Sequence, residues 1–228
     1  MKKLMICLSV FLISKQLFAA TISGSVQFSG TAPKMEKISM NADPTCSSLH
    51  PEPVYEETVV VNPNSTLKNV FVYVKEGLEG KTFDIPKEPV VIDQKGCQYH
   101  AHVFGIQAGQ ELSIVNSDNT LHNVHSLAEK SKQFNLGMPI QGMKLPKKFE
   151  APEVMVKFKC DVHPWMNAYI GVLNHPFFAV SDDQGKFEIK NLPAGDYTVE
   201  AWHEKYGIQT QKVTISGDSA TANFTFSG

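Results

Sequence analysis

The chain has 228 residues, of which 42% are hydrophobic, and its 21 basic and 23 acidic residues give a formal net charge of −2. This length and composition allow one or two domains with a real core and exclude disorder as the main state. Phosphate binding needs a clustered excess of cations, which the sequence lacks, so we do not expect nucleic acid as a partner.

Residues 1–20 have the order of a secretory signal peptide. Lys2 and Lys3 precede a short apolar run from Leu4 to Ile13, and small residues follow at the end. A membrane anchor would need about 20 apolar residues, and Lys15 ends this run far earlier. We therefore predict a signal peptide, a periplasmic or secreted protein, and no membrane span. Removal of the segment would leave 18 basic against 23 acidic residues.

From Thr21 onward the sequence has the pattern of strands and turns, without a sustained helical period. Apolar residues alternate with polar ones from Ile22 to Phe28, which predicts a half-buried strand. Residues 34–57 look irregular, and we expect further strands at Thr58–Val61 and Leu67–Val74. The predicted fold class is all-β.

Two later stretches contain soft metal ligands. Cys160, His163 and Met166 lie within seven residues, after a predicted strand in which Val154, Val156 and Phe158 share the inward face with Cys160. A thiolate, an imidazole and a thioether suit copper better than a hard cation, although they could simply be core and surface residues. A further histidine, His122, follows the alternating segment 111–115 in a turn-rich stretch.

The pairing of "NSDNTLHNVHS" with "CDVHPWM" resembles the cupredoxins, or blue copper proteins, and the short loop is most similar to that of the amicyanins. The resemblance extends from about Pro89 to Leu173. It implies a Greek-key barrel or sandwich that binds one type 1 copper ion and transfers electrons to a redox protein partner. The in-plane ligands would be His122, Cys160 and His163, and Met166 would be the weak axial ligand.

The same resemblance implies that Asn123 ties the two ligand loops together. Its partner in the family is usually a hydroxyl residue after the cysteine, and here that position is Asp161, so the detail of the tie is open. We expect His125 to be a surface residue. His100 and His102 could lie on one face, which leaves a second metal site open, although no further ligand is evident.

Pro164 and Trp165 follow His163. We expect the outer edge of the His163 ring to reach the surface there, in a small apolar patch that docks the redox partner. Contact of Trp165 with the other sandwich is an equal alternative.

Three cysteines remain after the signal peptide, which in an oxidising compartment suggests one disulfide and one thiol with another role. With Cys160 assigned to copper, we predict a bridge between Cys46 and Cys97. A bridge that involves Cys160 stays open as an alternative.

The C-terminal string "VSDDQGKFEIKNLPAGDYTVEAWH" predicts a hairpin around residues 183–185 and a turn at 192–196. It resembles the carboxypeptidase regulatory-like domain, a small transthyretin-type β-sandwich. Such modules usually begin with strands like "ISGSVQFSG" and "LKNVFVYVK", which here precede the copper segment. We therefore predict that residues 21–86 and 174–228 form one split sandwich with a cupredoxin domain, residues 87–173, inserted between them. Three consecutive units are the alternative.

These patterns favour an exported type 1 copper protein that carries single electrons. Residue patterns of an enzyme, such as paired carboxylates or a nucleophile motif, are not recognisable, so we do not expect an enzyme. A copper-storage protein would use the same ligands. A carbohydrate- or protein-interaction module with a non-redox metal site is a third possibility.

Overall fold

The structure, a computed structural model, describes residues 19–228 and is built almost entirely of strands. The all-β sandwich prediction is confirmed. Within the described residues the one helix is α1 (Pro44–Leu49), and no helix there is long and apolar enough to cross a membrane. β1 begins at Ala20, the last residue of the predicted signal peptide, and residues 1–18 of that prediction lie outside the described residues.

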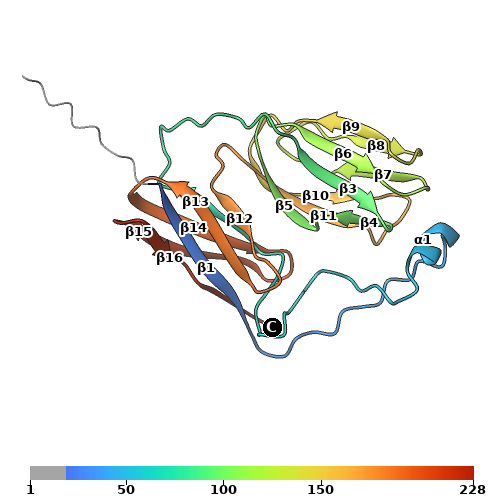
Figure 1. The fold of residues 1–228 in the computed structure, drawn as a ribbon, viewed down its shortest axis with the longest axis horizontal. Helices are drawn as coiled ribbons and strands as arrows, with labels where there is room; N and C mark the ends of the chain where they lie inside the picture. Colours follow the sequence, from blue (N-terminus) through green and yellow to red (C-terminus); the bar gives the residue numbers. More distant parts are fainter. Residues whose placement is uncertain (1–18) are drawn as a thin grey trace, which may run out of the picture.

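Two sandwiches lie side by side in the molecule (Figure 1). The first has one sheet in the order β13-β1-β16, with β17 also paired to β1, and a second sheet in the order β12-β2-β14-β15. The bounds of its strands are β1 (Ala20–Ser29), β2 (Phe71–Glu76), β12 (Phe178–Val180), β13 (Lys186–Leu192), β14 (Gly195–His203), β15 (Gly207–Ile215), β16 (Ser219–Thr221) and β17 (Phe224–Ser227).

The first sandwich combines the two ends of the described chain. All the strands that pair with β1 lie between Lys186 and Ser227, and β2 pairs with β12 and β14. The apolar residues of β1 that alternate in sequence, such as Ile22 and Val26, are fully buried in this core. These pairings support the split sandwich, whose boundaries stay a prediction.

The second sandwich has a five-stranded sheet in the order β5-β11-β10-β7-β8 and a four-stranded sheet in the order β4-β3-β6-β9. The bounds of its strands are β3 (Val90–Lys95), β4 (Gln98–His100), β5 (Val103–Gln107), β6 (Leu112–Asn116), β7 (His122–Ser126), β8 (Asn135–Met138), β9 (Lys144–Lys147), β10 (Glu153–Lys159) and β11 (Asn167–Leu173). Its core contains Cys160 and Met166, so the predicted ligand loop belongs to this sandwich.

A small apolar cluster joins the two sandwiches. Phe71 and Tyr73 of β2 pack there with Val103 of β5 and Leu173 of β11. A Cβ atom at Gly171 would lie 2.3 Å from Cζ of Phe71, so the absence of a side chain at residue 171 is what lets the aromatic ring pack against β11.

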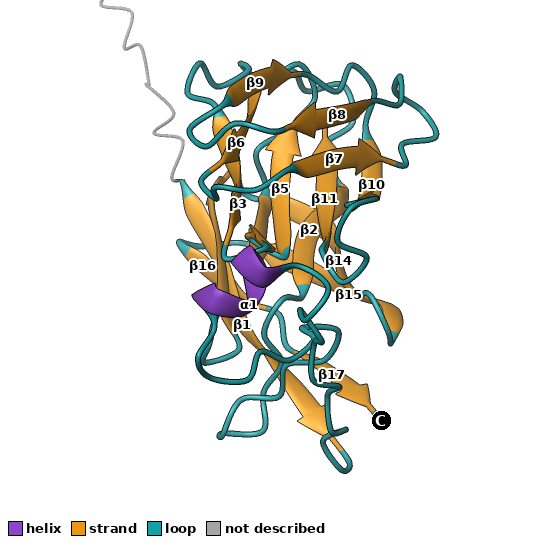
Figure 2. Ribbon diagram, turned by 90° about the vertical axis from the view of Figure 1, so that its right-hand side faces the viewer, coloured by secondary structure: helices purple, strands orange, loops and turns teal. Residues whose placement is uncertain are grey.

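One segment leaves the first sandwich and returns to it. Residues 36–56, which we call the strap, run from the end of β1 past the second sandwich and include α1 (Figures 1 and 2). The backbone N–H of Glu56 donates to the carbonyl of Glu36 at 3.0 Å, which closes the strap at its base. The buried strap residues Met40 and Cys46 belong to the core of the second sandwich, whereas Phe28 and Val59, which flank the strap in sequence, belong to the first.

Four local predictions differ from the structure. Thr58–Val61 is not a strand but makes one isolated bridge, between Val61 and Leu67, and the next strand starts at Phe71 rather than Leu67. The turn at residues 183–185 does not close a hairpin, because β12 pairs with β2 whereas β13 pairs with β1, so it links two sheets.

The fourth difference concerns β10. Val154 was expected on the inward face but is 38% exposed. Met155 has φ of +64° and the pairing register shifts between Glu153 and Val156. This bulge reverses the alternation before Val156, so only the residues after it keep the predicted phase.

Candidate metal centre

The ligand loop, residues 160–166, connects β10 to β11. Lys159, which ends β10, pairs with Asn167, which begins β11. Two backbone hydrogen bonds close it. The N–H of Cys160 donates to the carbonyl of Met166 at 3.1 Å, and the N–H of Met166 donates to the carbonyl of His163 at 2.9 Å. Because the loop folds back on itself, the three candidate ligands of this stretch lie at one end of the second sandwich.

His122 comes to the same end from a different strand pair. It is the first residue of β7 and pairs with Met138 of β8. The side-chain amide of Asn116 donates to the carbonyls of Thr120 and Met138, at 3.0 and 2.7 Å, and so fixes the loop that precedes His122.

The donor atoms converge. Nδ1 of His122 lies 2.9 Å from Nδ1 of His163, and the latter lies 4.0 Å from Sγ of Cys160. One ligand atom from each of these three residues falls within 4.8 Å of the others. All three side chains are buried, and Met166 is 1% exposed in the same core. The structure therefore brings the donor atoms of His122, Cys160 and His163 close together. It buries the fourth predicted ligand, Met166, in the same core as Cys160.

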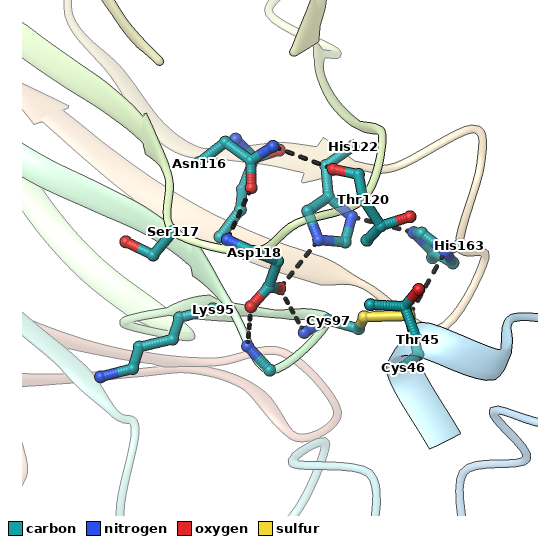
Figure 3. A network of polar contacts seen from close by, with 12 residues as sticks. Thr45, Cys46, Lys95, Cys97, Asn116, Ser117, Asp118, Thr120, His122 and His163 are labelled. Carbon is teal, nitrogen blue, oxygen red and sulfur yellow. Dashed lines mark hydrogen bonds and ion pairs between the residues drawn. A yellow bond between two sulfur atoms is a disulfide. The ribbon is translucent and has the colours of Figure 1, made fainter. Parts of the chain in front are cut away.

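Each imidazole is held by a carboxylate on its other nitrogen. Nε2 of His122 lies 2.9 Å from Oδ2 of Asp118, and Nε2 of His163 lies 3.0 Å from Oδ2 of Asp43. Figure 3 shows His122 between Asp118 and His163. Such pairs fix which ring nitrogen carries a proton and raise the basicity of the other, so both rings offer Nδ1 as the donor.

Hydrogen bonds offset the effect of burial on the pKa values of two groups in this site. Burial lowers the pKa of His122, but the hydrogen bonds to Asp118 and Cys160 outweigh it and raise that pKa to about 9. Burial raises the pKa of the Cys160 thiol, but hydrogen bonds from His122 and from the backbone N–H groups of Asn123 and His163 bring it below its usual value. These hydrogen bonds favour the thiolate, which is the form of cysteine that binds metal.

The residues fit copper. A thiolate, two imidazoles with Nδ1 turned inward and a nearby thioether are soft or borderline donors, and the nearby carboxylates are engaged on the far sides of the rings. Burial keeps water from the thiolate, which a cation would neutralise.

Asn123 connects the two ligand loops without a hydroxyl partner. Its Oδ1 accepts the backbone N–H of Asp161 at 2.7 Å and the thiol of Cys160 at 3.2 Å. The carboxylate of Asp161 accepts hydrogen bonds from the amides of Asn123 and Asn135, at 3.2 and 2.7 Å. Because the bond to Asn123 comes from the backbone N–H of residue 161, the connection between the two loops does not need a hydroxyl side chain at that position.

The expectation for His163 is wrong. Its outer edge does not reach the surface, because the ring is 2% exposed and is covered by Asp43 and Cys46 of the strap. Trp165 is half-buried: its ring centroid lies 5.1 Å from that of His163, and its Nε1–H donates to the carbonyl of Cys97 at 2.9 Å. Trp165 therefore packs within the second sandwich, rather than against the first as the alternative had it. Pro164 is exposed.

The other histidines lie outside the centre. His125 is partly exposed, and its Nδ1 bonds to Asp161 at 3.0 Å. His100 is exposed and contacts the carbonyl of Lys95, whereas His102 is buried against Glu204, so the two do not share a face. Within residues 19–228, the clusters of three or more potential ligands include neither of them.

The structure joins Cys46 to Cys97 in a disulfide, with an S–S distance of 2.01 Å, and Cys160 is not part of it.

Sequence reasoning missed both carboxylates of the centre, Asp118 and Asp43. Asp118 precedes His122 by four residues in the motif itself. Asp43 before Pro44 is a helix-start signal, but nothing local connects it to His163, which is 120 residues away.

Residues 161–227 match the family model of the carboxypeptidase regulatory-like domain. No curated protein matches the chain. Among solved structures, a copper-containing nitrite reductase from Thermus scotoductus SA-01 is similar at 19% identity and a TM-score of 0.36, over 51% of this chain and only 28% of the reductase. An amicyanin variant in its Cu(I) form is similar at 17% identity and 0.33, over 44% of this chain and 97% of amicyanin.

A purple cupredoxin from Nitrosopumilus maritimus is similar at 22% identity and a TM-score of 0.31, over 36% of this chain and 98% of the cupredoxin. Both families named from the sequence recur in these matches, each over part of the chain. TM-scores this low carry no weight for function. What the chain offers toward copper is the donor geometry of its own residues.

Proposed function

We propose that this chain is an exported type 1 copper protein that carries single electrons. The observation that carries the proposal is the buried convergence of His122, Cys160 and His163, with each imidazole held by a carboxylate on Nε2 and turned to offer Nδ1. Bound copper would supply a Cu(II)/Cu(I) couple. The protein's part is to hold the donors in place and keep water out.

Electron carriers need ligands that move little between the two oxidation states. Here the ligand loop is closed by its own backbone bonds, and the N–H of His163 donates to Sγ of Cys160 at 3.3 Å. Asn123 links the loop to β7. Hydrogen bonds to the sulfur and the buried surroundings are also the features that tune the potential of such a site.

Export agrees with the cysteine chemistry. A disulfide between Cys46 and Cys97 would persist in an oxidising compartment, and the predicted signal peptide directs the chain to the periplasm or outside the cell.

We place the docking surface for a redox protein at Pro164 rather than at His163, since the strap covers the latter. A cavity of about 370 Å³ opens there, and its lining residues are Leu127, Lys157, Lys159, Cys160, Asp161, Pro164 and Asn167. Cys160 is buried at the wall of this cavity, and its sulfur would be the most strongly coupled ligand.

The test is a visible absorption spectrum of the purified protein after loading with Cu(II), with Zn(II) loading as the control. We expect an intense blue or purple thiolate-to-copper band that bleaches on reduction. A colourless copper adduct would contradict the proposal. Zinc binds the same donor types without colour and distinguishes a non-redox metal site.

A copper-storage protein is the alternative that the donor set also allows. Electron self-exchange between the oxidised and reduced forms separates the two functions, because a storage site has no need of low reorganisation. Slow self-exchange in a coloured protein would favour storage. An interaction module would instead keep its partner after Cys160→Ser.

A further inference from the structure

Nε2 of His163 is hydrogen-bonded to a residue of the strap and not to a strand of the second sandwich. Asp43 lies in the strap, and its two carboxylate oxygens have separate tasks. Oδ1 accepts the backbone N–H groups of Thr45 and Cys46, at 2.7 and 3.2 Å, which caps α1. Oδ2 accepts the hydroxyl of Thr120 and the Nε2–H of His163, both at 3.0 Å.

This arrangement determines the tautomer of His163. Its two oxygens together accept four hydrogen bonds, from the N–H groups of Thr45 and Cys46, the hydroxyl of Thr120 and Nε2 of His163, so the carboxylate of Asp43 acts only as an acceptor. The proton of the neutral His163 ring is then on Nε2. The lone pair on Nδ1 faces His122 and Cys160, where a metal ion would be held.

The strap is fastened where Asp43 needs to be. Cys46, three residues after Asp43, forms the disulfide with Cys97. Further along the strap, Nε2 of His50 lies 2.6 Å from the carbonyl oxygen of Gly96. Met40 and Cys46 are buried in the core of the second sandwich. A segment attached at these points holds its carboxylate against the ring instead of leaving it to solvent.

We propose that Asp43 is a positioning residue for the copper centre, which holds His163 with Nδ1 inward and strengthens it as a donor to Cu(II), thereby lowering the reduction potential. The inference rests on the proposed function. The physical reason is that a carboxylate hydrogen-bonded to the far nitrogen raises the basicity of a ligand imidazole, and a more basic ligand with a negative charge behind it favours the more highly charged ion.

The test variant is Asp43→Asn. Asparagine is an equally good helix cap, so its Oδ1 can keep the bonds to Thr45 and Cys46. Its amide nitrogen replaces Oδ2 and cannot accept from His163. Glu52→Gln is the matched control, because it makes the same carboxylate-to-amide change at an exposed position of the strap.

We expect Asp43→Asn to weaken Cu(II) binding relative to Cu(I) by about tenfold or more, the range seen when such outer partners are removed. A tenfold change raises the potential by about 59 mV for one electron. Glu52→Gln should keep the wild-type potential. If the potentials of the two variants agree, Asp43 serves only as the cap of α1 and the proposal is wrong.

A second measurement needs neither copper nor the variant. Nitrogen NMR of the histidine rings in the metal-free wild-type protein should place the proton of His163 on Nε2. A proton on Nδ1 alone would overturn the proposal, even if copper never binds. If the tautomer is as expected but copper-loaded protein stays colourless, the proposed function fails and the positioning of the ring by Asp43 stands.

Discussion

The Nδ1 atoms of His122 and His163 face each other at 2.9 Å, although the residues are 41 positions apart and come from different loops. Two imidazoles approach this closely only with a proton between them or a metal ion to share. Burial lowers the pKa of His122, but Asp118 and Cys160 raise it to about 9, which favours a proton on this ring when no metal is bound. Both nitrogens, with the sulfur of Cys160, define the place where we expect copper.

The ligand assignment predicts different effects for two neighbouring histidines. His122→Ala should weaken copper binding and admit water, because it removes one strong donor. His125→Ala is the matched control on the same strand, since its Nδ1 contacts Asp161 rather than the centre. Copper titrations and visible spectra measure both. Loss of colour in His125→Ala with none in His122→Ala would contradict the site.

Cys160→Ser should abolish the intense colour, because the band depends on the copper–thiolate bond. The change is small in volume, and the residue is buried, so the fold should persist. The measurement is the visible spectrum beside a circular dichroism spectrum of the same sample. An unchanged visible band would mean that another group provides the colour.

Met166→Leu should have a milder effect. If Met166 is the weak axial donor that the resemblance implies, its loss leaves copper bound and coloured but raises the reduction potential, since donation to Cu(II) falls. Leucine keeps a similar volume at this buried position, which limits the packing cost. Voltammetry of the loaded variant tests this. Complete loss of copper would show that the thioether does more than a weak axial ligand.

Gly171→Ala should destabilise the protein by about 1–3 kcal/mol, the usual cost of overpacking a core. The added Cβ would meet the buried ring of Phe71 at 2.3 Å. Gly137→Ala is the control, because a Cβ there meets nothing within 4 Å. Urea unfolding of both variants gives the comparison. Equal free energies of unfolding would mean that the two sandwiches are not packed as described.

The buried pair His102–Glu204 joins the two sandwiches, with Nε2 of His102 at 2.5 Å from Oε1 of Glu204. Burial lowers the pKa of His102, but Glu204, Glu57 and the carbonyl of Asn167 raise it above 6.5 overall. The other titratable groups near the pair are Tyr169 and His203. The pair therefore stabilises fully below about pH 6.5, the unfolded pKa, and loses its contribution as pH rises through the folded pKa.

Glu204→Gln should then cost about 1.5–3 kcal/mol below pH 6.5, the range for a hydrogen bond to a charged group, and less at high pH. The control is Glu188→Gln, which removes an exposed partner of Lys190 and should change little at any pH. Unfolding free energies at several pH values measure both. A cost that grows with pH would reverse the sign and refute the charged pair.

Deletion of residues 174–228 tests the split sandwich. All strands that pair with β1 would be removed, so residues 21–29 would lose every sheet partner and expose their apolar face. We expect loss of slow amide exchange in β1 and β2. Cooperative unfolding of residues 21–86 in that truncation would favour three consecutive units instead.

Cys160, His163 and Met166 could be read as a candidate metal site from the sequence because they lie within one short loop, where spacing alone brings side chains together. The alternation of Ile22 to Phe28 likewise predicted β1, since the two faces of a strand have a period of two. The strand phase failed at Val154 because a bulge at Met155, which no residue pattern announced, shifts it.

By itself the sequence determined the all-β class and the chemical types of the donors, both of which depend on neighbouring residues. The tertiary structure alone decided what surrounds them. It placed Asp43 against a ring 120 residues away and covered the edge of His163 that the sequence suggested was exposed. It also linked β12 and β13 to different sheets across a turn with a hairpin's residues. The physical reason is that long-range contacts are selected by packing of the whole chain, and a local pattern carries no information about which distant partner will fill the space beside it.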